Sequence, residues 1–318
     1  MKLFKQIASL IALALLFASL DLCIYCFVTK RYENPLSDEM RAKSVELTEY
    51  LPFTEDSRIV KVDSALTLTG DIPVIDGAAA CVPFYSAFVN AVYPRESVKF
   101  EGDGFAPDSA MQYTNTRGAY KAVVDGGADI IICAGPSGEQ LAYAAENGVE
   151  LEFVPIGREA FVFIVNGDNP VGDLTVDQIK GIYTGKYKNW KELGGKNLPI
   201  DPLQRNKGSG SQTAMLAFMD GEKMQKRPFT IIGSAVGFSF RYYVTDMTGR
   251  QNVKMLSVNG AYPSAENIRN GSYPLISEIY AVYAKSNKNE NIPVLIDWIL
   301  SEEGQRIIEE SGYVGVSK

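Results

Sequence analysis

The sequence contains no histidine and only four cysteines among its 318 residues. Histidine is the commonest general acid and base near neutral pH and the commonest metal ligand, so its absence disfavours many enzyme mechanisms. No pair of CxxC motifs typical of a zinc site is present. A disulfide-built scaffold is also excluded, because such scaffolds are small and dense in cysteine. We therefore expect no enzyme, no metal site and no cofactor.

Basic residues are outnumbered too: 31 Lys and Arg face 38 Asp and Glu, which gives a formal net charge of −7. Nucleic acids are bound by clustered Lys and Arg, so the acidic balance argues against a nucleic-acid partner. The overall field of this protein would repel an anion. Any anion site must therefore be a local device, built from directed dipoles or a few buried cations.

The cysteines fall into two groups. Cys23 and Cys26 lie inside an apolar N-terminal segment, whereas Cys81 and Cys133 each lie at the end of an apolar run that predicts a strand. Cys81 and Cys133 could form a disulfide if those strands were neighbours. Two small buried hydrophobic residues are the preferred interpretation.

The N-terminus predicts an export signal. Lys2 and Lys5 precede an almost uninterrupted apolar stretch over residues 7–28, which is long for a cleaved signal and sufficient to cross a bilayer. We expect residues 1–32 to be an uncleaved signal anchor, with a cleaved signal peptide or lipidation at Cys23 as the alternative. In either case the remaining chain is expected to be an exported domain on the extracytoplasmic side of the cell membrane.

The rest of the chain divides into two parts by composition and hydrophobic pattern. Residues 33–70 are mixed and charged and predict a stalk or linker. From residue 71 onward, short β-rich runs alternate with helical patterns, which predicts an α/β fold with mainly parallel sheets. The length favours two domains or one two-lobed unit. In such folds ligands bind beyond the carboxyl ends of the strands, where helix N-termini converge.

The sharpest strand-to-helix junction is residues 205–213 (RNKGSGSQT). Glycines such as Gly210 let backbone N–H groups approach a ligand, and the helix start adds partial positive charge. Ser209 and Ser211 supply hydroxyl donors, and Arg205 supplies a planar fork suited to an oxyanion. The G-K-[ST] ending of a nucleotide-binding loop is missing. A flexible surface turn is the alternative, but the coincidence of arginine, hydroxyls and helix start favours a ligand site.

A second junction, residues 76–81 (DGAAAC), follows the first expected strand. Its small residues, Ala80 and Cys81 among them, would let backbone amides face a cleft. Tight packing of a helix against a strand explains the same residues, so this signal is weak.

A third junction is residues 115–119 (NTRGA), where Thr116 is the expected N-cap of a helix. Arg117 then falls in the first helical turn, where the helix dipole disfavours a cation by roughly 0.3–1 kcal/mol. A neighbouring anion would remove that penalty. A solvated surface arginine is an equally good interpretation.

Several motifs follow one another in a recognisable order. They are residues 157–165 (GREAFVFIV), 182–185 (IYTG), 189–195 (NWKELGG) and 205–211 (RNKGSGS). This series closely resembles the phosphate ABC-transporter substrate-binding family, which is PstS-like and has the type II periplasmic-binding-protein fold. The resemblance implies two α/β lobes joined by two crossing strands, with a ligand trapped between them and passed unchanged to an ABC permease in the membrane. We expect such a protein to act as a monomer.

The resemblance also implies the domain boundaries and the site. Residues 71–158 form the first part of lobe 1, residues 159–270 form lobe 2, and residues 271–318 return to lobe 1. The ligand-binding residues carried over from the family's loops, together with Arg117, are Arg205, Ser209, Gly210, Ser211, Thr116, Ala80 and Cys81. The expected ligand is phosphate or a related tetrahedral oxyanion.

Two departures from the family pattern matter. The first loop has no serine or threonine, and the family's aspartate, which accepts the proton of bound phosphate, falls at Ala134. Asp76 is a candidate substitute. Loss of the acceptor weakens discrimination between protonated phosphate and fully ionised sulfate, so an oxyanion ligand is better supported than phosphate itself.

A second hypothesis is a membrane-anchored sensor or interaction domain that keeps the fold but has lost or changed its ligand. A phosphatase is disfavoured, because no nucleophile with a base and no metal-ligand cluster is evident. Tyr183, Trp190 and Phe161 are expected to be core aromatics. Arg241 is expected to form an ion pair at the edge of the core, with a hinge role as the alternative.

Overall fold

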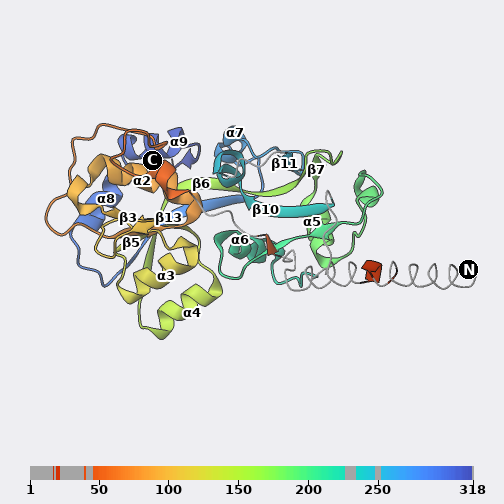
Figure 1. Ribbon diagram of the computed structural model, residues 1–318, viewed down its shortest axis with the longest axis horizontal. Coiled ribbons are helices and arrows are strands. Elements are labelled where there is room, and N and C mark those ends of the chain that lie inside the picture. Colours follow the sequence, from red (N-terminus) through yellow and green to blue (C-terminus); the bar gives the residue numbers. More distant parts are fainter. Residues whose placement is uncertain are drawn as a thin grey trace, which may run out of the picture.

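The computed structural model describes residues 17, 19–21, 39–40, 46–225, 234–247 and 252–316. Within these residues the chain forms two α/β lobes, and two long strands run from one lobe into the other (Figure 1). These strands are β6 (Leu151–Asn166) and β13 (Ile276–Ala284). At about 3.3 Å per residue, the 16 residues of β6 extend roughly 53 Å, enough to enter both lobes. The expected two-lobed α/β fold is confirmed.

One sheet runs through both lobes. Its strand order is β2 (Ile75–Gly77), β5 (Ile130–Ala134), β13, β6, β10 (Ala235–Phe240) and β8 (Asp201–Pro202), and β11 (Val253–Met255) and β14 (Val314–Gly315) also pair with β6. The expected parallel pairing is found in β2–β5 and β10–β8. All pairs that involve β6 or β13 are antiparallel instead, because β6 leaves the first lobe and β13 returns to it.

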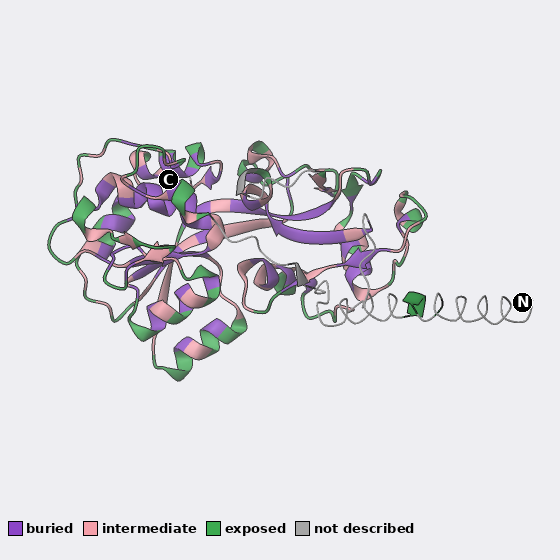
Figure 2. Cartoon of the chain, viewed as in Figure 1, coloured by how far each residue is buried: buried purple, intermediate pink, exposed green. Residues whose placement is uncertain are grey.

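The helices of the first lobe come from both halves of the chain. They are α2 (Val82–Val92), α3 (Asn115–Asp125), α4 (Gly138–Glu146), α8 (Asn291–Ile299) and α9 (Glu302–Glu310). Helix α2 lies in the interior, since Phe84, Tyr85 and Phe88 are fully buried. Burial of each such side chain stabilises the fold by roughly 1.5–3 kcal/mol. In contrast, α3 and α4 expose one face to solvent (Figure 2).

The second lobe is built on the far half of β6. It also contains β7 (Asp173–Leu174), β9 (Gln204–Arg205), β12 (Ser257–Val258), α5 (Val176–Thr184), α6 (Gly210–Met219) and α7 (Ala265–Arg269). The short strands β1 (Glu39–Met40), β3 (Phe100–Glu101) and β4 (Gly104–Phe105) pair as β1–β9 and β3–β4. Phe161, Tyr183 and Trp190 are buried in this lobe's core, as expected.

The segment expected as a stalk differs from that expectation. Tyr50, Ile59, Val62 and Leu68 are buried in the core of the first lobe. The backbone also reaches α2, because the N–H of Leu68 donates to the carbonyl of Val92 at 2.8 Å. Residues 46–70 are therefore part of the first lobe, since apolar side chains spaced among their charged residues provide enough surface to bury.

Most of the expected anchor, residues 1–32, lies outside the described residues. Across the described parts of the chain, we find no helix with the length and apolar character that a bilayer crossing requires. Cys23 and Cys26 also lie outside the described residues. Cys81 and Cys133 are buried and unbonded to each other, which confirms their interpretation as small hydrophobic residues.

Candidate functional site

Three turns from distant parts of the sequence meet in one cleft between the lobes, with a volume of about 180 Å³. Its lining residues are Ala78, Ala79, Ala80, Asn115, Thr116, Arg117, Arg205, Asn206, Lys207, Gly208, Ser209, Gly210, Ser211, Ser239, Phe240 and Tyr243. Of the predicted site residues, all but Cys81 are among them. The structure therefore brings together the three junctions at which the sequence predicts an anion site.

The 205–211 turn of the second lobe is held by two linked hydrogen bonds. Ser209 is the N-cap of α6, and its hydroxyl oxygen accepts from the N–H of Gln212 at 3.2 Å. The side-chain oxygen of Gln212 accepts in turn from the N–H of Arg205 at 2.8 Å. Because the Ser209 hydroxyl serves as an acceptor here, its own proton can be donated to a ligand in the cleft.

Arg205 brings positive charge to the cleft wall. The residue is 8% exposed, and its guanidinium carbon lies 5.9 Å from the centroid of the Tyr243 ring. An aromatic face at this distance stabilises a cation. A buried guanidinium interacts with an anion more strongly than an exposed one, because less water screens the charges.

The turn before α3 begins differently from the sequence expectation. Thr114 precedes the helix, and Thr116 is its second residue rather than its N-cap. The reason is Asp76, whose carboxylate accepts from the Thr114 hydroxyl at 2.5 Å and from the Thr114 N–H at 2.9 Å. Thr116 is 7% exposed and lines the cleft, so its hydroxyl still lies where a ligand would bind.

The carboxylate of Asp76 does not replace the family's proton acceptor. It is 1% exposed and is absent from the cleft lining, and burial raises its pKa despite the hydrogen bonds from Thr114 and Gly77. Ala134 does not line the cleft either. Among the described residues around the cleft there is no Asp or Glu, whereas Arg117, Arg205 and Lys207 are cations.

Cys81 does not line the cleft, contrary to the expectation. It is 3% exposed, and burial raises the pKa of its thiol above the ordinary value. The 3-10 turn Ala79–Cys81 presents Ala79 and Ala80 to the cleft and turns the cysteine side chain into the core. The residue type alone does not predict this orientation, because a small thiol is compatible with both the cleft wall and the core.

Glycine is favoured where the two lobes approach each other. A Cβ atom at Gly210 would lie 3.2 Å from Oγ1 of Thr116, and one at Gly208 would lie 3.2 Å from Cδ of Arg117. Gly208 also has a φ of +81°, which favours glycine. Nearby, Lys207 forms an ion pair with Glu139 of the opposite lobe. The turn is therefore shaped to meet the start of α3 closely.

The cleft has the electrostatics of an anion site. The first residues of α3 and α6 line it, so the positive ends of two helix dipoles converge there, and the 3-10 turn that precedes α2 lines it as well. Thr116, Ser209, Ser211 and Ser239 add hydroxyl groups. This arrangement can hold a small oxyanion by hydrogen bonds and charge.

Ser239, Phe240 and Tyr243 were not predicted as site residues. Ser239 and Phe240 come from the end of β10, and Tyr243 begins the following π-helical turn. All three belong to the run GFSFRYY over residues 237–243. A polar serine between two buried phenylalanines of one strand is the signal that could have identified it.

The fold and cleft are those of a two-lobed binding protein. A family model described as a PBP superfamily domain matches residues 83–303, so the chain belongs to this family. The resemblance that the sequence motifs indicated is thereby confirmed.

Individual relatives agree with this assignment. The phosphate-binding protein PstS of Bacillus subtilis is 30% identical over 221 residues, which cover 60% of this chain and 72% of that protein. PstS of Borreliella burgdorferi is 24% identical over 180 residues, 50% of this chain and 63% of that protein.

Solved structures show the same arrangement. A Clostridium perfringens protein assigned to phosphate ABC transporters as a substrate-binding protein, with bound phosphate, matches with a TM-score of 0.58 and 27% identity, covering 76% of this chain and 98% of its own. An ABC-type phosphate transport receptor from Vibrio cholerae matches with a TM-score of 0.56 and 20% identity over 76% and 99% of the two chains. The latter supports the fold alone.

Proposed function

We propose that this protein captures phosphate, or a similar tetrahedral oxyanion, in the cleft between its lobes and delivers it to an ABC permease. The observation that carries the proposal is the convergence of Arg205, the α6 turn and Thr116 on one small cleft. Hydroxyl groups and helix starts around a buried guanidinium suit a compact anion. The phosphate-binding relatives support the same ligand class.

We further propose that the exported domain stays tethered to the extracytoplasmic face of the cell membrane by residues 1–32 and acts as a monomer. The apolar stretch over residues 7–28, flanked by Lys2 and Lys5, supports the tether. A tether would keep the captured oxyanion near the membrane in which the permease lies. No catalytic step is part of the proposal, because transfer between binding site and permease leaves the ligand unchanged.

The decisive experiment is calorimetric titration of the full chain, purified in mild detergent, with inorganic phosphate. Wild-type protein is expected to bind one phosphate per chain. Arg205→Ala is expected to weaken binding by a hundredfold or more, since about 3 kcal/mol is typical when a buried charge partner is removed.

Arg306→Ala is the matched control. Arg306 is an exposed arginine of α9 that pairs with Glu310 on its own helix, so its loss should leave phosphate affinity unchanged. Full affinity in Arg205→Ala would refute the site. No heat with either phosphate or sulfate in the wild-type protein would refute the function and favour the anchored sensor or interaction domain.

A further inference from the structure

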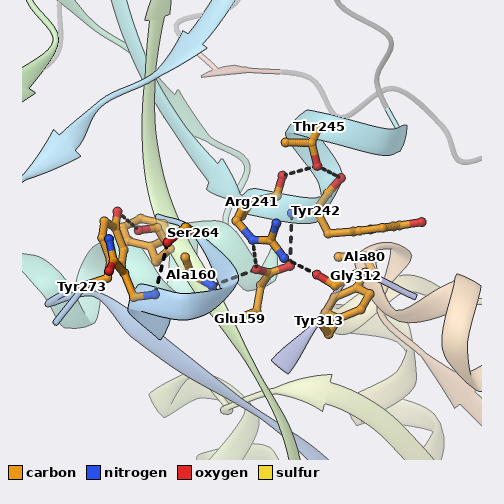
Figure 3. A network of polar contacts seen from close by, with 12 residues as sticks. Ala80, Glu159, Ala160, Arg241, Tyr242, Thr245, Ser264, Tyr273, Gly312 and Tyr313 are labelled. Carbon is orange, nitrogen blue, oxygen red and sulfur yellow. Dashed lines mark hydrogen bonds and ion pairs between the residues drawn. The ribbon is translucent and has the colours of Figure 1, made fainter. Parts of the chain in front are cut away.

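A buried carboxylate lies where β6 passes from the first lobe to the second. Glu159 is 2% exposed. Its Oε1 lies 3.4 Å from Nε of Arg241, and its oxygens accept from the N–H groups of Ala160 at 2.8 Å and Tyr242 at 3.1 Å (Figure 3). The ion pair expected for Arg241 is thereby confirmed. A carboxylate buried this deeply needs such partners, because desolvation disfavours its charged form.

On the second-lobe side, the ion pair fixes a wall of the cleft. Arg241 and Tyr242 stand in the sequence between Phe240 and Tyr243, both of which line the cleft, and Ser239 lines it as well. Two contacts with Glu159 therefore hold the backbone from which these three side chains project. Displacement of Arg241 would shift them.

On the first-lobe side, the same network reaches the first turn. Nη2 of Arg241 donates to the carbonyl of Gly312, and the hydroxyl of Tyr313 donates to the carbonyl of Ala80, which lines the cleft (Figure 3). The rings of Tyr242 and Tyr313 pack against each other in a tilted arrangement, with centroids 4.7 Å apart. One continuous set of contacts thus connects Glu159 with both walls.

We propose that Glu159 and Arg241 are positioning residues that hold the two walls of the cleft in the arrangement that binds the oxyanion, so that affinity depends on the charge of Glu159. The inference rests on the proposed function, oxyanion binding in the cleft. Neither residue lines the cleft. Their effect is transmitted through Phe240 and Tyr243 on one side and Ala80 on the other.

The groups packed around Glu159 place its change of charge near neutral pH. Arg241 and Tyr242 face it from the second lobe, and Cys81 and Tyr313 face it from the first. Burial raises the pKa of Cys81 and Tyr313, so both stay neutral. Burial also raises the pKa of Glu159 to about 7, against the opposing effect of Arg241. Protonation of Glu159 therefore removes the charge that holds Arg241.

The test is the affinity of the full chain for sulfate between about pH 6 and pH 8, since sulfate itself does not titrate in this range. In the wild-type protein, affinity is expected to fall about tenfold as the pH is lowered, which corresponds to about 1.4 kcal/mol. Glu159→Gln is expected to bind about tenfold more weakly at pH 8 and to show a flat pH profile. Glu159→Asp, which keeps the charge, should recover part of the pH dependence.

Glu309→Gln is the matched control, because Glu309 is an exposed carboxylate paired with Arg269, and it should reproduce the wild-type profile. A Glu159→Gln variant with wild-type affinity and pH profile would overturn the proposal. So would wild-type affinity that rises as the pH falls, since it would show simple repulsion between Glu159 and the anion.

A ligand-free measurement separates this inference from the proposed function. In Glu159→Gln, amide hydrogen exchange over residues 78–81 and 239–243 is expected to accelerate at least severalfold at pH 8, because both walls lose their common support. Failure of the wild-type chain to bind phosphate or sulfate would overturn the function, whereas unchanged exchange in these two segments would overturn the positioning role itself.

Discussion

The charge of Glu159 lowers the stability of the folded protein, while the same charge holds Arg241 beside the cleft. The carboxyl is 2% exposed, and burial raises its pKa to about 7 although Arg241 opposes the shift. The ionised form is therefore disfavoured in the folded protein relative to the unfolded chain. If the charge is nevertheless required to hold Arg241 in place, position 159 gives up stability to keep the cleft arranged.

The raised pKa of Glu159 makes the stability of the fold depend on pH in a definite direction. Because the pKa of Glu159 in the folded protein, about 7, lies above its ordinary value of 4.5, the folded protein binds more protons than the unfolded chain between these two pH values. The stabilising contribution is thus full below about pH 4.5 and is lost as the pH rises through about 7, amounting to about 3 kcal/mol. Urea denaturation of wild-type and Glu159→Gln proteins at about pH 5 and pH 8 measures it.

The difference in free energy of unfolding between the two proteins is expected to move in favour of Glu159→Gln as the pH rises. Other carboxylates, including the buried Asp76, contribute equally to both proteins and cancel in this difference. Parallel pH dependence in the two proteins would contradict the assigned burial of a titrating Glu159.

At the cleft, the sequence indicated the position of side chains with one plausible role, and their binding of a ligand stays a prediction. Arg205, Ser209 and Ser211 were identified because a guanidinium and two hydroxyls coincide with a glycine-rich helix start. Cys81 was misplaced, because its orientation depends on a 3-10 turn that no local pattern encodes. Glu159 was missed altogether, since its partners lie 82 residues away at Arg241 and at the C-terminal end of the chain.

At the scale of elements, the cleft depends on how closely two helix starts meet. Gly210 is the first residue of α6, and a Cβ there would lie 3.2 Å from Oγ1 of Thr116 and 3.6 Å from the ring of Phe240. The contact with Phe240 is an ordinary packing distance, but the contact with Thr116 is tighter than normal packing, so Thr116 would have to move by a few tenths of an ångström.

Gly210→Ala is therefore expected to weaken phosphate binding about tenfold, or about 1.4 kcal/mol, by separating the walls. Gly138→Ala is the matched control, because Gly138 is likewise the first residue of its helix and has open space around it. Calorimetry on both variants gives the comparison. Equal affinities in the two would show that the close approach is irrelevant to binding.

Element boundaries were predictable where local signals act alone. The start of α6 agrees with its serine cap, whereas α3 begins earlier than expected because Asp76, 38 residues before Thr114 in the chain, binds the residue that precedes the helix. The expectation of a stalk was wrong for the same reason, because contacts with distant parts of the chain decide the outcome. Isolated apolar residues such as Ile59 and Val62 become informative only when the surface that buries them is known.

At the scale of the whole molecule, the crossing strands explain both the cleft and the limits of prediction. Alternating strands and helices favour a parallel sheet, but β6 and β13 run between lobes in opposite directions and therefore pair antiparallel. The return of residues 271–318 to the first lobe was implied only by family resemblance, since no local pattern specifies which lobe a late segment joins. Within that range, residues between Ile279 and Tyr313 contribute to the core of the first lobe.

The two lobes also resolve the apparent conflict between an acidic protein and an anionic ligand. The net charge of −7 is spread over the chain, while Arg117, Arg205 and the starts of α3 and α6 are concentrated at the cleft. Screening by salt reduces the repulsion from distant surface charges, whereas the dipoles that touch the ligand are little affected. Local geometry therefore decides what is bound.

The most direct measurement of this account is a crystal structure of the full chain with arsenate, a tetrahedral analogue of phosphate whose arsenic atom is located by anomalous scattering. We predict a single strong arsenic peak between the 205–211 turn and Thr116, within hydrogen-bonding reach of Arg205. A peak elsewhere, or an empty cleft at millimolar arsenate, would contradict the account.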